Sequence, residues 1–235
     1  MARIVILTGA GISAESGIRT FRAADGLWEN HRVEDVATPE AFRRDPSLVY
    51  RFYNLRREQL LSDEVAANAA HEALARLEDA FPGEVLVVTQ NIDDLHERGG
   101  SENVIHMHGE LLQSWCLACD GRTETLGAVD AGSACAGCGV VGRMRPDIVW
   151  FGEIPYAMER IEEALTGCRI FAAIGTSGNV YPAAGFVRFA DSVGAHTVEL
   201  NLEASLVHSA FAEVRQGPAT EVVPQWVDEV IAAGR

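Results

Sequence analysis

The sequence lacks the features that define several large classes of protein. No apolar run in its 235 residues approaches the roughly 18 residues that a membrane-spanning helix needs, so we expect no membrane span. The first apolar stretch, residues 4–7, is too short for a secretory signal, and no small-residue cleavage site follows it. The 8 prolines and 22 glycines are scattered and 48% of the residues are hydrophobic, which excludes collagen-like and disordered chains.

Positive charge is in short supply. Only 19 residues are Lys or Arg against 34 Asp and Glu, which gives a formal net charge of −15, and no basic run is present. Affinity for a phosphate backbone depends on clustered basic side chains, so we expect no direct binding to nucleic acid. An acidic protein suits basic partners, such as lysine-rich segments of other proteins.

Cysteine is also scarce, and the spacing of the five cysteines excludes a disulfide framework. Four of them form two Cys-x-x-Cys pairs, Cys116 with Cys119 and Cys135 with Cys138, and fifteen residues separate the pairs. This spacing predicts one structural zinc ion held by four thiolates. Cys168 stands alone in an apolar context. Reduced thiols of this kind fit the cytoplasm.

Apolar runs and helix signals alternate along most of the chain. We expect strands at residues 3–7, 84–89, 104–107, 148–150, 169–174 and 196–200. Helices are expected at 46–61, from an Asn68 cap to 81, at 155–165, at 182–193 and from Pro224 onward. This alternation predicts an α/β fold with a Rossmann-like, doubly wound parallel sheet.

One stretch interrupts the alternation. Residues 109–145 contain the cysteine pairs and few large apolar side chains, so they need the metal to fold. We therefore expect an inserted zinc-binding module at 109–145, within a Rossmann-like domain formed by 1–108 and 146–235. A helical insertion around 30–70 is expected to contribute to the smaller domain.

The glycine motif Gly9-x-Gly11-x-x-Ala14 directly follows the first strand. Glycines at such a turn allow close approach of the backbone to a pyrophosphate, at the start of a helix. A plain strand–helix turn would also explain the motif. No second strand ending in an acidic residue follows about twenty residues later, which argues against hydride transfer.

Small polar residues follow the other expected strands. The carboxyl ends of parallel strands meet at one edge of the sheet, so these residues should face the same crevice. They are Gly175, Thr176 and Ser177, then Asn201, Leu202 and Glu203, and, after the strand at 84–89, Gln90, Asn91, Ile92 and Asp93. The stretch His106-Met107-His108-Gly109 follows Val104, at another strand end. A histidine there is either an ordinary surface or core residue or, beside an amide and a carboxylate at the next strand end, a general base.

Tyr53 and Arg56 lie three residues apart on the helix expected at 46–61, so they share a face. They form either an exposed arginine beside a half-buried tyrosine, or a fork that binds a carboxylate.

Taken together, these motifs resemble the sirtuins, a family of NAD-dependent protein lysine deacylases. The resemblance covers essentially the whole chain in the correct order. It rests on the string from Gly9 through Ala10, Ser13, Ala14 and Ser16 to Phe21 and Arg22, on Gln90-Asn91-Ile92-Asp93, on His108-Gly109, on the four cysteines and on Gly175-Thr176-Ser177.

The resemblance implies a set of roles. His108 would be the general base, and Asn91 and Asp93 would be catalytic residues that hold the nicotinamide ribose and the nicotinamide amide. NAD would bind between the Rossmann domain and the zinc module, along Gly9, Ala10, Gly11, Ser13, Ala14, Phe21, Arg22 and Trp28, the residues Gln90, Asn91, Ile92 and Asp93, the strand ends Gly175, Thr176, Ser177, Asn201, Leu202 and Glu203, and Ala219.

The implied reaction removes acetyl and acidic acyl groups from lysine side chains and releases nicotinamide and acylated ADP-ribose. The acyl-lysine peptide would add as a strand beside Val149, Phe151, Gly152 and Val180. Tyr53 and Arg56 match the pair by which the class III, desuccinylase-type branch recognises acidic acyl groups, and Ala37 falls where that branch keeps a small residue. Acylated-lysine proteins would be the partners, and no oligomer is required.

Several other functions use part of the same motifs. A mono-ADP-ribosyltransferase would use the same NAD site. A zinc-ribbon nucleic-acid binder would explain the cysteines but not the acidic charge, and a dehydrogenase would explain only the first glycines. A non-catalytic NAD sensor would not need His108, which this sequence retains.

Overall fold

The structure is a computed structural model, and it describes residues 3–18, 27–28 and 31–234. Its centre is a six-stranded sheet in which every neighbouring pair is parallel, in the order β11-β10-β9-β1-β4-β5. The strands are β1 (Arg3–Thr8), β4 (Glu84–Thr89), β5 (Val104–His106), β9 (Ile170–Ile174), β10 (His196–Asn201) and β11 (Glu213–Gln216). The chain fills one half of the sheet outward from β1 and then the other half, so the predicted doubly wound α/β fold is confirmed.

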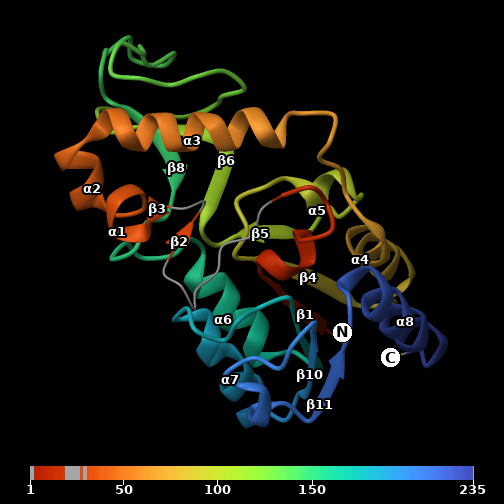
Figure 1. Ribbon diagram of the computed structural model, residues 1–235. Coiled ribbons are helices and arrows are strands. Elements are labelled where there is room, and N and C mark those ends of the chain that lie inside the picture. The colour runs from red at the N-terminus through yellow and green to blue at the C-terminus, as the bar shows by residue number, and fades with distance from the viewer. Residues whose placement is uncertain (1–2, 19–26, 29–30, 235) are drawn as a thin grey trace.

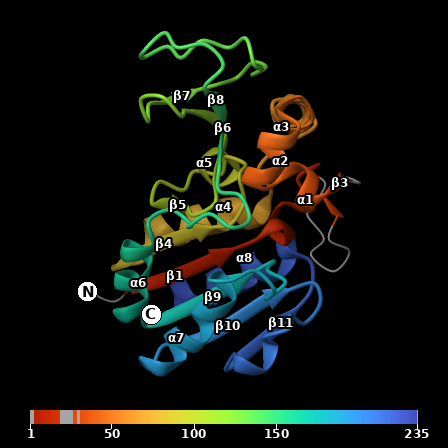
Figure 2. The ribbon, with the colours of Figure 1, turned by 90° about the vertical axis from the view of Figure 1, so that its left-hand side faces the viewer.

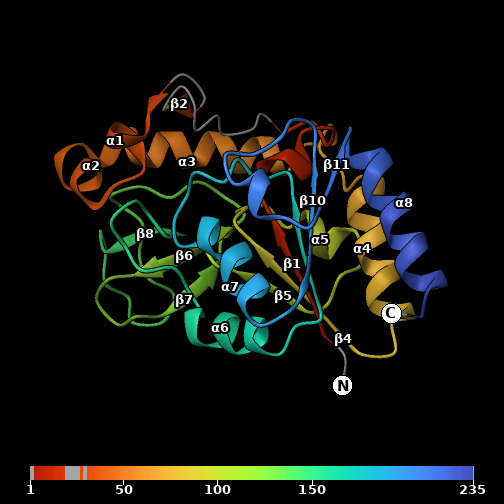
Figure 3. The same ribbon diagram turned by 90° about the horizontal axis from the view of Figure 1, so that it is seen from below.

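Helices cover both faces of this sheet. Figure 3 shows α4 (Ala69–Ala80) and α8 (Ala219–Ala232) on one face and α6 (Met158–Thr166) and α7 (Phe186–Ser192) on the other. Alternate residues of β1 enter the two cores: Ile4 and Ile6 face α4 and α8, whereas Val5 and Leu7 face α6 and α7. Such nearly continuous apolar strands are typical of a sheet that is buried on both sides.

A second, smaller layer lies above the sheet in Figures 1 and 2. It contains α1 (Val33–Val36), α2 (Pro39–Arg44) and α3 (Pro46–Leu60), and an antiparallel sheet in the order β7-β6-β8. These strands are β6 (Gly109–Cys116), β7 (Arg122–Glu124) and β8 (Met144–Ile148), and a separate hairpin pairs β2 (Leu27–Trp28) with β3 (His31–Arg32). α3 buries Phe52 and Tyr53 in a shared core with Ile148.

Local signals explain where the helices of this layer begin. Pro39 and Pro46 occupy the first turns of α2 and α3, where a missing N–H costs nothing. The side chain of Thr38 accepts a hydrogen bond from Ala41 N, and that of Asp45 accepts one from Leu48 N. The expected cap at Asn68 is confirmed, because its side chain accepts a hydrogen bond from Ala70 N in the first turn of α4.

Several sequence-based expectations were wrong in detail. In place of the strand expected at 148–150, the structure has β8, which begins at Met144, ends at Ile148 and runs antiparallel to β6. Its buried Arg145 and Asp147 interrupt the apolar pattern, so the sequence did not indicate this strand. The last helix begins at Ala219, five residues before Pro224. The helix expected after the glycine motif is only a four-residue 3-10 turn, η1 (Ala10–Ser13).

Two further helices are shorter than expected. α6 begins at Met158 because Ala157, with φ of 55°, has a left-handed backbone. The helix expected at 182–193 divides into a 3-10 turn, η2 (Ala183–Gly185), and α7. The sequence pattern did not indicate β6, β11 or the short helix α5 (Leu95–Arg98), and it gave no bounds for α1 and α2 within the helical insertion expected around 30–70. Within the described part of the chain, no helix is long and apolar enough to cross a membrane.

Candidate functional site

The loops after β1 and β9 are bonded to one another at the point where the strand order reverses. Gly9 N donates to Ile174 O at 3.0 Å, and Gly11 N donates to Gly175 O at 2.9 Å. A Cβ atom on Gly11 would lie 2.6 Å from the Cα of Gly175, so the close approach requires glycine. Gly175 itself has φ of 61°, which side chains disfavour. This switch point is where open parallel sheets bind their ligands.

The turn after β4 joins the same edge through side chains. Nδ2 of Asn91 donates to Gly9 O at 3.2 Å and to Oγ of Ser13 at 3.1 Å. Oγ of Ser13 donates in turn to Oδ2 of Asp93 at 3.3 Å. Burial raises the pKa of the Asp93 carboxyl to about 6. The predicted residues Gly9, Ser13, Asn91 and Asp93 therefore form one connected polar cluster.

His108 follows β5 and is half-buried beside this cluster. Its Nδ1 lies 3.1 Å from the main-chain oxygen of Gln90. A carbonyl can only accept, so Nδ1 carries the proton and Nε2 is left as an acceptor. Burial lowers the pKa of His108, which keeps the ring neutral near pH 7. The orienting partner is a main-chain carbonyl, whereas the sequence suggested a side-chain amide and carboxylate.

The strand ends of β9 and β10 form the other half of the edge. Nδ2 of Asn201 donates to Thr176 O at 2.7 Å, and Asn201 O accepts from Gly217 N at 3.0 Å. Ser177, Leu202 and Glu203 lie exposed in the loops that follow these strands. Ala219 is the first residue of α8 and is partly buried against the core.

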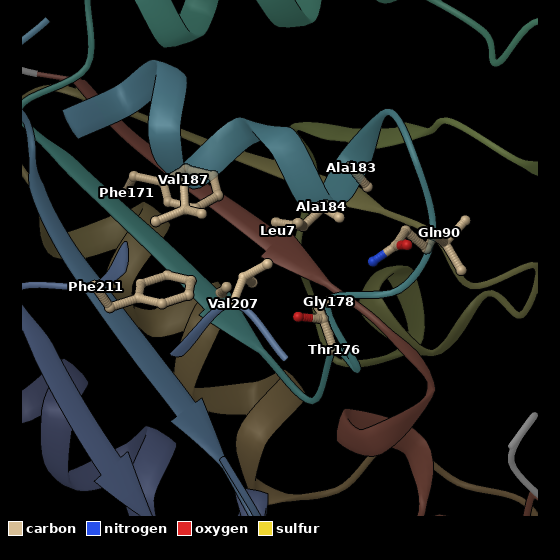
Figure 4. Close-up of a pocket in the computed structure, with 12 residues that line it drawn as sticks. Leu7, Gln90, Phe171, Thr176, Gly178, Ala183, Ala184, Val187, Val207 and Phe211 are labelled. Atoms are coloured by element: carbon tan, nitrogen blue, oxygen red, sulfur yellow. The ribbon is translucent and has the colours of Figure 1, made fainter. Parts of the chain in front are cut away.

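A small hollow opens between the two halves of the edge. Figure 4 shows apolar side chains from β1, β9, α7 and the 207–211 segment around it, with Gln90 and Thr176 at its polar side. Val180 also lines it. Its volume of about 10 Å³ is room for a single water molecule, so it is not by itself a site for a dinucleotide.

The segment after β8 connects this edge to the smaller layer. Val149 N donates to the main-chain oxygen of His108 at 2.8 Å, and Phe151 N donates to Ala37 O at 3.0 Å. Ala37 is buried, whereas Phe151 and Gly152 are exposed. The strip 149–152 is therefore held from both sides and presents an exposed surface next to His108.

Tyr53 and Arg56 lie on α3 above this strip. Tyr53 is fully buried, its Oη accepts a hydrogen bond from Nε1 of Trp150 at 2.9 Å, and burial raises its pKa. The Arg56 guanidinium lies 4.3 Å from the centre of the Phe52 ring and donates to Phe52 O. Arg56 is half-buried, which differs from the exposed helical arginine considered from spacing alone.

The four cysteines of the module converge. Their Sγ atoms all lie within 4.8 Å of one another, and Cys116 and Cys135 are buried. No disulfide joins them, and Cys168 lies apart, buried against α6 and α7. Four thiolates at this spacing suit tetrahedral zinc and leave no position for water, so the predicted metal site fits a structural ion.

Part of the expected nucleotide segment falls outside the part of the chain that the structure describes. Phe21 and Arg22 lie outside the described residues, and Trp28 belongs to β2. Conversely, the sequence reading missed Thr8, Thr89 and His96, which are buried directly behind the site. It also missed Arg145, whose guanidinium lies 3.4 Å from the centre of the Trp150 ring and forms an ion pair with Glu153.

The fold and the site define a class: α/β proteins that bind a nucleotide at the switch point of a parallel sheet and carry a four-cysteine metal module. The chain belongs to the Sir2 family, whose sequence profile matches residues 9–182. The resemblance to sirtuins is thereby confirmed.

Named relatives cover nearly the whole chain. A protein of Pasteurella multocida (strain Pm70), called NAD-dependent protein deacylase, is 59% identical over 229 residues, which are 97% of this chain and 98% of the relative. A protein of the same name from Escherichia coli (strain K12) is 59% identical over 97% of this chain and 82% of its own length.

Solved structures agree with the fold. A Sir2 homologue in complex with NAD superposes with a TM-score of 0.88 at 37% identity, covering 99% of this chain and 91% of that one. A Sir2 protein bound to an acetylated peptide has a TM-score of 0.81 at 27% identity, covering 98% and 92%.

Proposed function

We propose that this protein is an NAD-dependent protein lysine deacylase. The reaction breaks the bond between nicotinamide and ribose and the amide bond of the acyl-lysine, and it consumes one water. The products are free lysine, nicotinamide and ADP-ribose that carries the acyl group as an ester. NAD is therefore a co-substrate, and acylated-lysine proteins are the partners.

One observation carries this proposal: His108 is bonded to both sides of the site. Its ring is held by Gln90 O at the sheet edge, and its own carbonyl holds Val149 of the exposed strip. A neutral imidazole with a free acceptor nitrogen can take a proton from a hydroxyl near pH 7. We assign His108 as the general base, acting on a ribose hydroxyl.

The connected polar cluster supports binding of NAD at the switch point. Gly9, Gly11 and Gly175 bring backbone close together there, and Asn91 and Asp93 offer an amide and a carboxyl to a ribose and a carboxamide. The other residues assigned to NAD are Ala10, Ser13, Ala14, Phe21, Arg22, Trp28, Gln90, Ile92, Thr176, Ser177, Asn201, Leu202, Glu203 and Ala219. Solved relatives with NAD in place support this assignment.

The peptide is assigned to the strip 149–152 and Val180. A strip held at both ends, with Phe151 and Gly152 exposed, favours addition of an extended peptide as a strand. A Sir2 relative bound to an acetylated peptide supports this mode. The acyl group would then point toward Ala37, Tyr53 and Arg56, whose guanidinium matches the carboxylate of a succinyl or malonyl group.

The zinc ion is assigned to Cys116, Cys119, Cys135 and Cys138 and has a structural role. We retain the division into a Rossmann-like domain, 1–108 and 146–235, and a module at 109–145, with the 30–70 insertion in the smaller domain. The free thiols support a reducing compartment, and we place the protein in the cytoplasm.

The test compares an acetylated and a succinylated peptide, each incubated with and without NAD and followed by mass spectrometry. We expect loss of the acyl group only with NAD, together with acylated ADP-ribose. Acyl removal without dinucleotide would contradict the proposal. Transfer of labelled ADP-ribose onto protein, without lysine deacylation, would indicate the mono-ADP-ribosyltransferase instead, which the deacylase relatives do not favour.

Two variants test the residue roles. His108→Tyr should keep its zinc content and lose turnover, and substantial remaining activity would contradict the base assignment. Arg56→Met should lower desuccinylation by ~30-fold or more, because deleting one partner of a buried charge pair costs about 2–5 kcal/mol. Deacetylation should fall far less, and equal losses on both peptides would contradict the acyl-site assignment.

A further inference from the structure

The carboxyl ends of β1 and β4 carry two hydroxyl groups inside an apolar core. Thr8 and Thr89 are paired in register across these parallel strands, and both are 0% exposed. They stand at the ends of side-chain columns that include Ile6 and Val87 and face α4. Burying an unpaired hydroxyl costs about 1–3 kcal/mol, and valine would fill the same volume. The hydroxyls at these positions therefore call for hydrogen-bonding partners.

The two hydroxyls form a continuous chain of hydrogen bonds. Oγ1 of Thr8 donates to Oγ1 of Thr89 at 2.9 Å and lies 2.9 Å from Nε2 of His96. Oγ1 of Thr89 also accepts from Asn91 N at 3.1 Å. Thr8 has a single hydroxyl proton, which goes to Thr89, so Nε2 of His96 is the donor to Thr8. The chain thus runs from the His96 ring to the backbone of Asn91.

The surroundings of His96 keep its ring in the neutral form. It lies on α5 and is 0% exposed, and its Nδ1 has no hydrogen-bond partner among the residues that the structure describes. Burial lowers its pKa well below the usual value, so the ring is neutral. Its ring meets that of His71 edge to face, with centroids 5.0 Å apart.

His71, the second of these two rings, is connected through Asn68 to the loop after β1. Its Nδ1 accepts a hydrogen bond from Asn68 N at 3.3 Å, and Nδ2 of Asn68 donates to Ile12 O at 2.9 Å and to Oγ of Ser16 at 2.8 Å. The two buried imidazoles are therefore coupled to the loop after β1 as well as to the turn after β4.

We propose that His96, Thr8 and Thr89 are positioning residues that fix Asn91 for catalysis. Asn91 in turn bridges Gly9 O and Oγ of Ser13, so its placement sets the spacing of the two loops. None of the three residues touches a reacting atom in the proposed mechanism. This inference rests on the proposed function, because it concerns the geometry of that site.

Thr8→Val is the first test, since it keeps the volume and removes the hydroxyl. We expect kcat to fall by ~10-fold or more, with KM for the acyl-peptide changed less than ~2-fold, because small displacements of positioning groups act on the chemical step. Thr8→Ser keeps the hydroxyl and should restore most of kcat.

Thr197→Val is the matched control. Thr197 is also 0% exposed on the same sheet, and its Oγ1 accepts from Ala212 N at 2.9 Å, but it lies outside the site. It should lower the free energy of unfolding and leave kcat unchanged well below the melting temperature. Equal losses of kcat in Thr8→Val and Thr197→Val would show a purely structural role and overturn the proposal.

Two substitutions of His96 complete the test. His96→Gln places an amide N–H near the former Nε2 and should keep more activity than His96→Leu. The double variant Thr8→Val with His96→Leu should lose no more than either single variant, because both break the same chain. Equal activity of the Gln and Leu variants, or full additivity in the double variant, would overturn the proposal.

One measurement separates this inference from the proposed function. Long-range proton–nitrogen NMR of the histidine side chains reports tautomers without any activity. We expect the Nε2–H tautomer of His96 in the wild type between pH 6 and 9, and a shifted signal in Thr8→Val. The Nδ1–H tautomer, or an unchanged signal in Thr8→Val, would overturn the hydrogen-bond chain. A wild type without NAD-dependent deacylation would overturn the proposed function alone.

Discussion

The nucleotide edge of the large sheet and the four-cysteine module are held together in opposite ways. At the edge, loops from β1, β4 and β9 are joined by short hydrogen bonds, and backbones approach so closely that a single added Cβ would collide. In the module, the buried core is small, and two of its members, Cys116 and Cys135, belong to the four-cysteine cluster proposed to hold zinc. Packing fixes the first region, whereas the metal must fix the second.

Polar side chains of α3 attach the module to the rest of the smaller layer. Asn54 exchanges two hydrogen bonds with the backbone of Val129, and the Tyr50 hydroxyl donates to Met144 O at 2.6 Å. These bonds attach the module to α3, and Nη1 of Arg57 also donates to Gly127 O at 3.2 Å. The space beside Gly127 and Gly139 is nevertheless open, because an added Cβ would meet no atom within 4 Å. Variants in the two regions should therefore lose stability for different reasons: tight backbone packing at the nucleotide edge, and loss of the metal in the module.

Loss of the metal ligands should have the largest effect. Structural zinc contributes about 10 kcal/mol or more to small metal modules, far more than any side-chain contact here. Cys116→Ser, or a strong chelator, should remove zinc, expose residues 117–143 to proteases and abolish deacylation, while the apolar sheet stays folded. Zinc content, limited proteolysis and circular dichroism measure this. Cys168→Ser, away from the cluster, is the control and should retain zinc.

Gly175→Ala should have the next largest effect. The added Cβ would meet the backbone of Gly11 and Ile12, and the φ of 61° is unfavourable for alanine. We expect the free energy of unfolding to fall by about 3 kcal/mol in urea melts. Gly127→Ala in the module should change it by less than about 0.5 kcal/mol. Similar losses at both positions would mean that the two regions do not differ in packing.

Asp93→Asn should separate stability from activity. Because burial raises the pKa of Asp93 to about 6 from 3.8, the folded state binds the proton more tightly than the unfolded one. The stabilising effect is complete below pH 4 and is lost as the pH rises through 6. The variant should therefore be more stable than the wild type by about 3 kcal/mol at pH 8, less so at pH 5, and should lose activity. A constant difference between pH 5 and 8 would refute this reading.

Glu15→Gln should have a smaller effect. The Glu15 carboxylate accepts from Thr220 N at 3.2 Å and from the Thr220 hydroxyl, at the first turn of α8. A negative charge at a helix amino terminus contributes about 0.3–1 kcal/mol. The melting temperature should fall slightly, and KM for NAD should rise, since Ala219 begins this helix. Glu162→Gln on α6 should change neither quantity.

The smallest expected effect comes from a property that both regions share. All 19 basic residues counted as Lys or Arg are arginine, so the chain contains no lysine. The protein cannot carry the side-chain modification that it is proposed to remove. Treatment with a reactive acyl thioester should add mass only at the terminal amine and leave activity unchanged. Acylation at internal positions, detected by peptide mapping, would contradict this expectation.

The sequence predicted the large sheet better than the smaller layer, for a physical reason. Strands such as β4 are continuous apolar runs, and the predicted bounds 84–89 match it. β8 contains Arg145, Pro146 and Asp147, which are buried only because partners such as Glu153 and Arg122 come from elsewhere in the chain. Such pairing is not visible in a local pattern.

The site residues, too, could be predicted only where a local sequence pattern marks them. The glycine motif and the strand ends could be read from the sequence because they follow apolar runs directly. The roles of Thr8, Thr89 and His96 could not, since a threonine at the end of a strand is ordinary until its partner is known. The ending of two neighbouring strands in threonine was the one available signal.

The double attachment of His108 has a consequence for engineering. Its carbonyl is bonded to Val149, so the strip proposed to receive the peptide and the proposed base move as one piece. Grafting a foreign segment onto 149–152 to change peptide preference would tilt the imidazole as well. Selectivity is therefore better redesigned on α3 at positions other than Tyr53, because the Tyr53 hydroxyl is itself bonded to Trp150 of the strip.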